Sequence, residues 1–443
     1  MKKENLYKAV GMIDDEYIES VNRLRTNRKS NKNKYLKIIA VAACFSLVFT
    51  AVTFAFLGNS AKAEDLMEGI TPQPVQPVEL FKNNANVADF ALRLAQATNV
   101  ESEGENLLIS PLSVMCALSM TVNGANGETK AQMEEVLGIT SEELNGYIYT
   151  YISSLESSGN AKFNIANSIW FKNNGINPKR DFLQINADYY NASIYKAPFD
   201  KTTLNDINNW VKKNTEGMIP SILNNIPDTA VMYLINALAF EAEWKDKYCE
   251  EFVKNGEFTL EDGGKKNVEY MYSSEDYYLE TDNATGFLKE YKNTRYAFVA
   301  LLPNENVSVA SLLSSLDGKT VHSLLQKPTI CSVDTKMPKF QTEYSVEMKD
   351  VLCSMGMTDA FDAYLADFSK MADGDLCINR VLHKTFITVD EAGTRAGAAT
   401  AVELTLGGMP DEPKKVYLDR PFVYMLVDRK TDTPFFIGTM MNP

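Results

Sequence analysis

Two apolar patterns follow one another along the chain after residue 79. Val87, Phe90 and Leu94 recur at spacings of three and four, which predicts a helix with one buried face. Residues 231–240 (VMYLINALAF) are apolar on both alternating faces, which predicts a central strand covered on both sides. Residues 296–302 and 422–427 show the same pattern and predict two more strands of this kind.

Capping residues place two further helices. Ser110 precedes Pro111, so a hydroxyl cap is followed by proline at the first helical position, where its missing N–H costs nothing. The apolar run 112–122 continues this helix. Another helix is predicted over residues 207–211, and Gly217 is well placed to end it.

The mixture of elements predicts one α+β domain, because helices come mainly early and strands mainly late. Hydrophobic residues make up 45% of the chain and charged residues 23%, which is ordinary for a globular protein. Residues 79–443 contain no repeat or second linker. Residues 58–78 include three prolines and are expected to form an extended spacer.

The segment before the spacer has the pattern of a membrane anchor. Residues 38–57 carry no charge, and as a helix they would span about 30 Å, the thickness of a bilayer core. Basic residues between Arg23 and Lys37 precede this run without an acid among them. The positive-inside rule therefore places residues 1–37 in the cytoplasm and the remaining chain outside.

Two other interpretations compete for this segment. Ala61-Lys62-Ala63 resembles a signal-peptidase site, so the segment could be a signal peptide removed near Ala63. The uncleaved anchor is favoured, because the run is long for a signal peptide. Val41-Ala42-Ala43-Cys44 resembles a lipoprotein box, but too few apolar residues precede Cys44 and too many follow it. Each version exports the rest of the chain.

Charge and the rare residue types narrow the functional classes. A formal net charge of −14 argues against nonspecific nucleic-acid binding. The six cysteines form no CxxC pair, and His322 and His383 have no metal-ligand spacing with them. We therefore expect mostly buried, unpaired thiols and neither a metal nor a cofactor. Without G-x-S-x-G, H-E-x-x-H or a glycine-rich phosphate loop, the sequence does not favour an enzyme.

The most informative stretch lies at residues 389–401 (VDEAGTRAGAATA). A strand over residues 386–389 leads into it, and small residues follow Glu391. A surface loop or a weak alanine-rich helix would be the plain interpretation. With a strand period of two, one face carries only small uncharged side chains, namely Thr394, Ala396, Ala398 and Thr400. Arg395 falls on the other face, so this segment could slide between two strands, with Gly393 as its hinge.

This stretch resembles the reactive-loop hinge of inhibitory serpins, with Glu, Gly, Thr and then alternating alanines. The resemblance extends over nearly the whole chain after residue 79. Segments similar to serpin signatures follow in the same order: 106–114 (NLLISPLSV), 163–171 (FNIANSIWF), 209–219, 234–237 (LINA), 337–340 (MPKF), 355–357 (MGM), 367–369 (DFS), 421–423 (PFV), 435–438 (FFIG) and 442–443 (NP).

The resemblance implies the serpin fold, with helices packed around three β-sheets and an exposed C-terminal reactive loop. It also implies a monomeric suicide-substrate inhibitor of serine proteases, not an enzyme. The target protease would cut the loop and form a covalent acyl complex, and the cut loop would insert as a central strand that traps it. The hinge residues implied are Glu391, Gly393, Thr394, Ala396, Ala398, Ala399 and Thr400.

Other residues gain roles from the same resemblance. A polar cluster beneath the opening sheet is implied for Ser110, Ser113, Asn236 and His383, and Trp244 is expected where the loop enters. Asn236 shares a face with Leu234 and Leu238, and a buried amide needs hydrogen-bond partners. A helix cap for Ser110 and a satisfied core histidine for His383 are plainer interpretations, and both are compatible with this structural role.

The cut is expected between residues 404 and 410. Counting from Glu391 points to Gly407, whereas counting back from Pro421 points to Pro410. Leu406 is the favoured residue, followed by Met409 and Leu404, with Gly407 and Gly408 in the same region. Leucine or methionine suits a subtilisin-, elastase- or chymotrypsin-like protease, and the absence of Lys and Arg from this region disfavours trypsin-like targets.

Two alternatives remain. A non-inhibitory serpin would act as a surface binding protein, but such members carry bulky or charged hinge residues that this chain lacks. A membrane-anchored sensor would signal through residues 1–37, a segment too short to fold alone. The basic anchor and the missing disulfide framework point to a bacterial surface protein.

Overall fold

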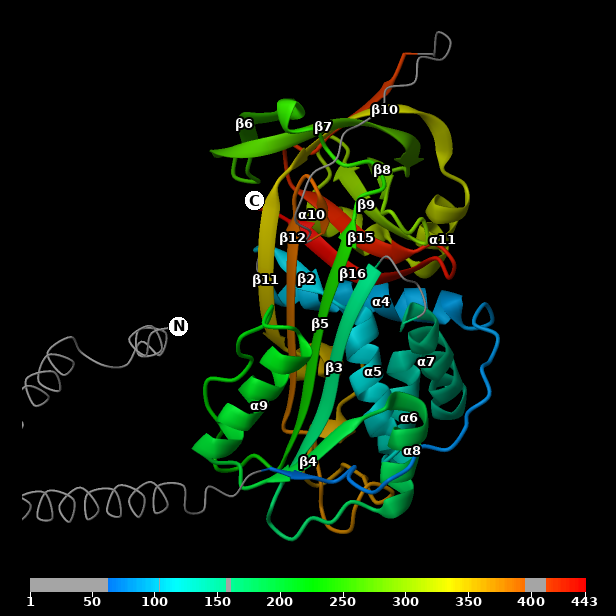
Figure 1. The fold of residues 1–443 in the computed structure, drawn as a ribbon, viewed down its shortest axis with the longest axis vertical. Helices are drawn as coiled ribbons and strands as arrows, with labels where there is room; N and C mark the ends of the chain where they lie inside the picture. The colour runs from blue at the N-terminus through cyan, green and yellow to red at the C-terminus, as the bar shows by residue number, and fades with distance from the viewer. Residues whose placement is uncertain (1–62, 103, 157–160, 395–411) are drawn as a thin grey trace, which may run out of the picture. The chain divides into compact units, whose positions relative to one another are not determined.

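Two large β-sheets organise the chain in a computed structural model that describes residues 63–102, 104–156, 161–394 and 412–443 (Figure 1). These residues belong to one unit, Ala61–Pro443. Within the described residues, no helix combines the length and the apolar character that crossing a membrane requires. The expected anchor at residues 38–57 lies outside the described residues and stays a prediction.

The helices are α4 (Asn84–Glu101), α5 (Pro111–Val122), α6 (Gly127–Leu137), α7 (Ser141–Glu156), α8 (Arg180–Tyr190), α9 (Lys201–Asn214), α10 (Val309–Ser315), α11 (Gly318–Gln326) and α12 (Lys349–Ser354), with short 3-10 turns η1 (Glu250–Phe252) and η2 (Asp359–Phe361). The strands are β1 (Glu64–Asp65), β2 (Leu107–Ile109), β3 (Ala161–Lys172), β4 (Ser193–Ala197), β5 (Met232–Glu243), β6 (Val253–Thr259), β7 (Lys265–Glu280), β8 (Ala284–Glu290), β9 (Tyr296–Pro303), β10 (Thr329–Pro338), β11 (Phe340–Glu347), β12 (Arg380–Val389), β13 (Gly393–Thr394), β14 (Lys414–Tyr417), β15 (Phe422–Asp428) and β16 (Thr433–Met440).

The first sheet has the order β1-β4-β3-β5-β13-β12-β11, and β5 also pairs directly with β12. The sequence predicted β5 as a central strand covered on both faces, and this is confirmed, because its residues from Met232 to Phe240 are all buried. Leu234 and Leu238 face the main core, whereas Tyr233, Ile235 and Ala237 join a second cluster. The two faces of β5 thus contact different layers.

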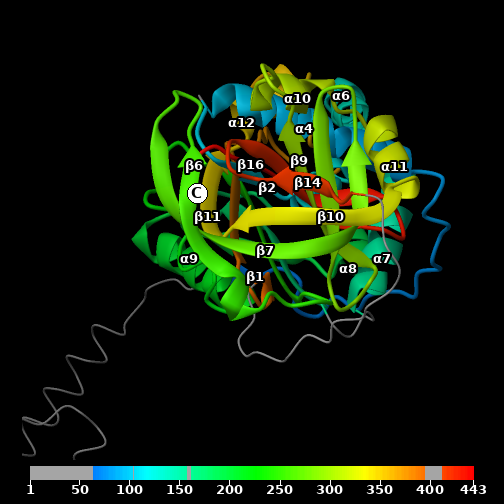
Figure 2. The ribbon, with the colours of Figure 1, turned by 90° about the horizontal axis from the view of Figure 1, so that it is seen from above.

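The second sheet has the order β14-β10-β7-β8-β9-β15-β16-β2, with β6 added on β7. From above, β7 and β10 lie side by side across the molecule (Figure 2). The resemblance implied three sheets, but here two of them are continuous. The reason is the length of β7. Its first residues pair with β6 and its last residues pair with β8, while β10 pairs with it from Tyr270 to Tyr278.

Helices cover the first sheet on its two faces. The α5 helix starts as predicted, because the Ser110 hydroxyl accepts from the Ser113 N–H and Pro111 occupies the first turn. Every residue of α5 is buried, which places this helix inside the molecule. On the other face α9 packs Ile207 and Val211 into the second cluster. Beyond α9, Gly217 has a φ of +82° and its N–H bonds the Lys212 carbonyl, which ends the helix as predicted.

The expected spacer at residues 58–78 differs from Ala63 onward, where the chain runs along the domain. Glu64 and Asp65 form β1, which pairs antiparallel with β4 at the edge of the first sheet. Further along, the Gln73 N–H donates to Asp188 and the Val78 N–H donates to Thr150. Backbone groups make these contacts, so the proline-containing composition gave no sign of them.

The cysteines match the expectation only in part. The five described cysteines are unpaired, as predicted. Only Cys116 is buried, and burial raises the pKa of its thiol to about 12. The other four are partly exposed, so the expectation of mostly buried thiols was wrong. Cys44 lies outside the described residues.

Candidate functional site

The chain reverses direction directly after β12. The Asp390 carboxylate accepts from the N–H groups of Ala392 and Gly393, and the Asp390 N–H donates to the Gly393 carbonyl. This turn returns the chain as β13, which pairs antiparallel with β5 and with the end of β12. Asp390 was part of the quoted stretch, but the sequence alone gave it no role.

The predicted hinge residues Gly393 and Thr394 form β13. A Cβ at Gly393 would lie 2.1 Å from the carbonyl oxygen of Ala242, so only glycine allows this close approach to β5. Thr394 is fully buried, and its hydroxyl lies 2.6 Å from the hydroxyl of Tyr291. The face that carries Thr394 is therefore the face that contacts the main core.

Trp244 and Tyr248 hold the backbone of the hinge. The Trp244 indole N–H donates to the Asp390 carbonyl over 2.8 Å, and its backbone N–H donates to the Ala392 carbonyl over 3.0 Å. The Tyr248 N–H donates to the carbonyl of Glu391 over 3.0 Å. Trp244 therefore contacts the residues at the start of the loop, the region for which the resemblance implied it.

An ion pair joins the hinge to the residue between β10 and β11. Lys339 Nζ lies 2.5 Å from Glu391 Oε1, and both side chains are about one-quarter exposed, at 27% and 26%. Partly exposed ion pairs of this kind contribute at most about 1 kcal/mol to stability. This contact locates Glu391 at the edge of the turn, while its backbone is held by Tyr248.

Below β13, the strands β5 and β12 are direct neighbours. They pair in parallel through seven residue pairs, from Arg380↔Tyr233 to Phe386↔Ala239. At the upper end β13 stands between them, so the sheet is parted there and closed below. The strands β5 and β12 therefore form both the parted end of the sheet and its closed part.

The four residues of the implied polar cluster meet beneath the closed part. The Ser110 N–H donates to His383 Nε2 over 2.9 Å, and the Ser113 hydroxyl donates to Asn236 Oδ1 over 2.8 Å. Because Nε2 accepts, the ring proton lies on Nδ1, which donates to Asn236 Oδ1. His383 and Asn236 are themselves opposite each other in the β5–β12 ladder.

The cluster is buried and neutral. Burial lowers the pKa of His383 to about 3. All four residues have no exposed surface, and Asn236 Nδ2 has no hydrogen-bond partner among the described residues. The histidine contacts the backbone of Ser110, not a serine hydroxyl, so the arrangement is not an activated nucleophile. Its chemistry suits a role in holding strands together.

Several predicted site residues fall outside the described residues. They are the hinge residues Ala396, Ala398, Ala399 and Thr400 and the cut-region residues Leu404, Leu406, Gly407, Gly408 and Met409. The other histidine, His322, lies at the surface 3.0 Å from Asp432. Within the described segments, no cluster of three His, Cys, Asp or Glu side chains could hold a metal ion.

The structure adds residues that the sequence did not single out. Tyr291 stacks on Trp244 with ring centroids 4.5 Å apart while its hydroxyl contacts Thr394. No local pattern marks Tyr291, because its partners lie about fifty and one hundred residues away. Lys339 belongs to the MPKF segment already noted for its resemblance, which was the available signal.

Comparisons with known proteins agree with this geometry. A family model described as Serpin (serine protease inhibitor) matches residues 85–443. The crystal structure of tengpin, a thermophilic serpin, in its native state superposes with a TM-score of 0.83 at 48% identity, covering 86% of this chain and 100% of that chain. The latent state of tengpin gives a lower TM-score of 0.72 at the same identity, covering 83% and 99%.

Curated relatives match over most of their length. An uncharacterised serpin-like protein of Thermococcus kodakarensis is 31% identical over 76% of this chain and 81% of its own. Human neuroserpin is 27% identical over 81% of this chain and 91% of its own. Thyroxine-binding globulin, solved in complex with thyroxine, shares the fold at 24% identity with a TM-score of 0.74. Because the family model matches residues 85–443, which is most of this chain, the chain belongs to the serpin family.

Proposed function

We propose that this serpin is a suicide-substrate inhibitor of serine proteases and not an enzyme. A target protease cuts the reactive loop and is held as an acyl-enzyme while the cut loop inserts between β5 and β12 as a new strand. The native fold is then a kinetically trapped state, and inhibition draws on the free energy released by insertion. The greater similarity to native than to latent tengpin supports a starting state in which the sheet is still closed below β13.

The register of the described strands carries this proposal. Thr394 is opposite Ala242 on β5 and opposite Val389 on β12. Continuing both antiparallel ladders residue by residue brings Thr400 opposite Asn236 on one side and His383 on the other. These two residues already face each other in the closed sheet. The strands would therefore only have to part sideways, by about one strand spacing of 4.8 Å, without sliding lengthwise.

Side-chain size supports the same register. On the core side, Ala396 would lie between Phe240 and Ile387, which are both buried. Large neighbours on both walls leave room for small side chains only, and the alternation of the loop supplies them. Arg395 would point to the opposite face, beside Glu241.

The inserted strand would also satisfy a polar group. Asn236 Nδ2 has no partner among the described residues, and an unpaired buried donor costs about 1–3 kcal/mol. A Thr400 hydroxyl arriving beside Asn236 offers an acceptor. Insertion would also separate His383 from Asn236, so the Thr400 hydroxyl would stand in for the direct hydrogen bond between them.

The proposed targets are subtilisin-, elastase- or chymotrypsin-like proteases. Leu406 is the favoured residue for the main pocket of the protease, with Met409 and Leu404 as the next candidates. The absence of Lys and Arg near the expected cut disfavours trypsin-like proteases. The protein acts as a monomer, because one domain carries both the loop and the sheet that receives it.

We further propose that residues 38–57 anchor the protein in a bacterial cell membrane with the serpin domain outside. The support is the uncharged run preceded by basic residues. Secretion after cleavage near Ala63 is the alternative, and Ala63 lies one residue before β1.

Incubation of the full chain, in mild detergent, with each protease class tests the inhibitory function. The expected result on denaturing gels is a covalent complex of serpin and protease, together with a released C-terminal fragment whose mass identifies the cut. Cleavage of the loop by every protease class without a covalent complex would contradict inhibition and favour a surface binding protein.

A further inference from the structure

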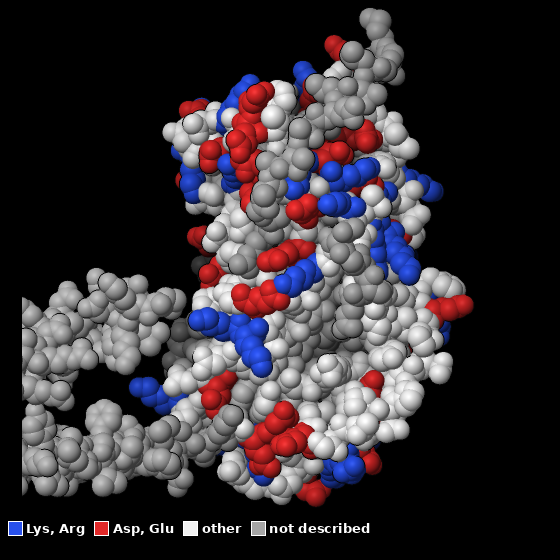
Figure 3. All heavy atoms as spheres, viewed as in Figure 1, with Lys and Arg blue, Asp and Glu red and all other residues white. Residues whose placement is uncertain are grey.

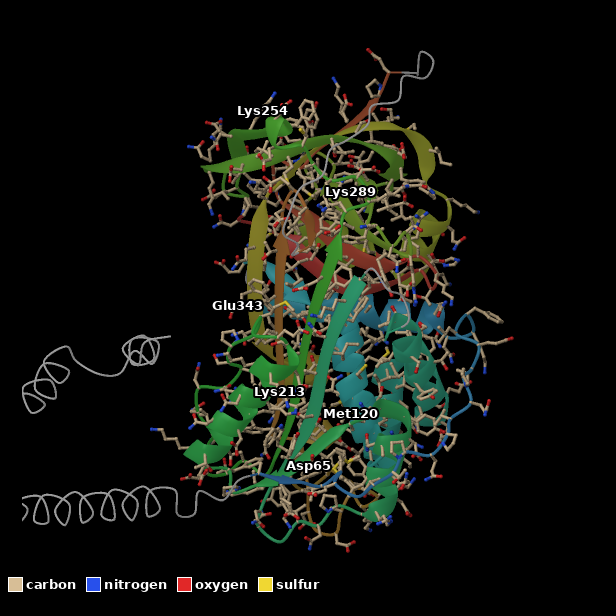
Figure 4. The ribbon with its side chains drawn as sticks, in the orientation of Figure 1. Asp65, Met120, Lys213, Lys254, Lys289 and Glu343 are labelled. Carbon is tan, nitrogen blue, oxygen red and sulfur yellow. The ribbon has the colours of Figure 1, made fainter. Side chains whose placement is uncertain are left out.

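A buried ion pair lies beneath the aromatic residues that hold the hinge. Lys289 of β8 is 2% exposed and Glu275 of β7 is 9% exposed, with Nζ 2.7 Å from Oε1. Figure 4 labels Lys289 near the upper end of β5. Taking two charges out of water is costly, and a buried pair is a weak source of stability, so its geometry matters more than its strength.

The ammonium of Lys289 faces two aromatic rings. Its Nζ lies 4.3 Å from the ring centroid of Tyr248 and 5.5 Å from that of Trp244. A cation over an aromatic face is attracted by the ring quadrupole, and the attraction is strongest where water is excluded. The carboxylate of Glu275 is fixed in turn by the hydroxyl of Ser273, which also contacts Thr335.

The same two aromatic residues donate the hydrogen bonds that fix the hinge. Trp244 binds the carbonyls of Asp390 and Ala392, and Tyr248 binds that of Glu391. Tyr291, stacked on Trp244, contacts Thr394. The ion pair is therefore one layer removed from the hinge and reaches it through Trp244 and Tyr248.

This inference rests on the proposed function, because it concerns the insertion of the same loop. We propose that Lys289 and Glu275 are positioning residues that hold Trp244 and Tyr248 against the hinge and so slow opening of the sheet before the loop is cut. Two other cations in this region pair with a different carboxylate. Lys245 and Arg429 both pair with Glu290, the residue that follows Lys289 in β8. The ion pair of Glu275 is formed with Lys289.

Uptake of a synthetic strand by the uncut protein measures this opening without any protease. The probe is a peptide with the sequence of residues 393–405 (GTRAGAATAVELT), and uptake is followed by the mobility of the full chain on native gels. In Lys289→Met we expect uptake about tenfold faster than in the wild type, a barrier lower by about 1.4 kcal/mol. Lys289→Arg, which keeps the charge, is expected to retain the wild-type rate.

Arg295→Met is the matched control, because it breaks another buried ion pair whose partners are Asp428, Ser154 and two tyrosine rings. Each variant is compared at the same interval below its own unfolding midpoint, which removes effects of stability alone. Arg295→Met is expected to lower the midpoint without changing the matched uptake rate.

The outcomes separate the two proposals. Equal matched rates in Lys289→Met and Arg295→Met would overturn the positioning role and leave the inhibitory function standing. No uptake by the wild-type protein would overturn strand insertion itself, and the positioning role with it. If Lys289→Met does not fold, Glu275→Gln, which keeps an oxygen for Lys289, decides the question by the same comparison.

Discussion

At the scale of single residues, His383 makes the closed sheet sensitive to pH. Its pKa in the folded protein is about 3, below the ordinary value of 6.5, because burial disfavours the charged ring. As the pH falls, His383 is therefore protonated in the unfolded chain before it is protonated in the folded protein. The part of the free energy of unfolding that His383 contributes above pH 6.5 is lost progressively towards pH 3. The loss should amount to about 1.4 kcal/mol per pH unit within this window.

Urea unfolding of the full chain at pH 7, 6 and 5 measures this slope. In His383→Gln, which keeps an acceptor and a donor but does not titrate, we expect the slope to be flatter by about 1.4 kcal/mol per unit between pH 6 and 5. The same slope in both proteins would mean that His383 is not the group responsible.

Residues differ in how far the sequence could predict them. Asn236 and His383 were found because the resemblance supplied their roles, and the structure brings them together. Tyr291 and Asp390 could not be found in this way. The role of Tyr291 depends on stacking against Trp244, which follows β5 and is distant in sequence, and that of Asp390 on a turn geometry that several sequences can form.

At the scale of elements, the two faces of the inserted strand give the sharpest test of the register. The double variant Arg395→Ala/Ala396→Arg moves one positive charge from the outer face to the core face without changing the composition. Burying an unpaired charge costs several kcal/mol, so we expect cleavage without trapping. The number of serpin molecules cut per covalent complex, read from denaturing gels, measures the effect.

Arg395→Ala alone is the matched control and is expected to trap protease like the wild type. Thr394 is a poorer position for such a charge, because it is already buried before cleavage and its replacement would also disturb the uncut protein. Efficient trapping by the double variant would contradict the face assignment.

Elements with their own apolar pattern were predicted, and elements that depend on distant partners were not. The strand β5 and the capped helix α5 follow from local sequence, because burial on both faces and a Ser-Pro start leave clear signals. The strand β1 has only two residues and exists through its pairing with β4, more than one hundred residues away. Pairing over such a separation leaves no local pattern.

At the scale of the whole molecule, charges of both signs are interspersed over the face shown in Figure 3, above and beside α9. Neither sign of charge dominates among the described residues visible on that face, and the loop and its sheet are the proposed contact with a protease. The chain has a net charge of −14, which adds a general repulsion from nucleic acids.

The proposed anchor predicts how the full chain fractionates. When the full chain is expressed in a bacterium, it should stay in the membrane fraction through an alkaline wash, because an apolar helix of this length inserts stably. Mass spectrometry of the retained protein should find peptides from residues 1–37. A soluble product that begins at Glu64 would instead identify Ala63 as a cleavage site.

The structure of the protein after its loop has been cut would show directly whether the loop inserts between β5 and β12. We predict a new strand between β5 and β12, with Thr400 opposite both Asn236 and His383 and with the core-side row of Thr394, Ala396 and Ala398 buried. The seven direct pairs from Arg380↔Tyr233 to Phe386↔Ala239 would then be gone. A cut protein in which these pairs persist would rule out inhibition by strand insertion.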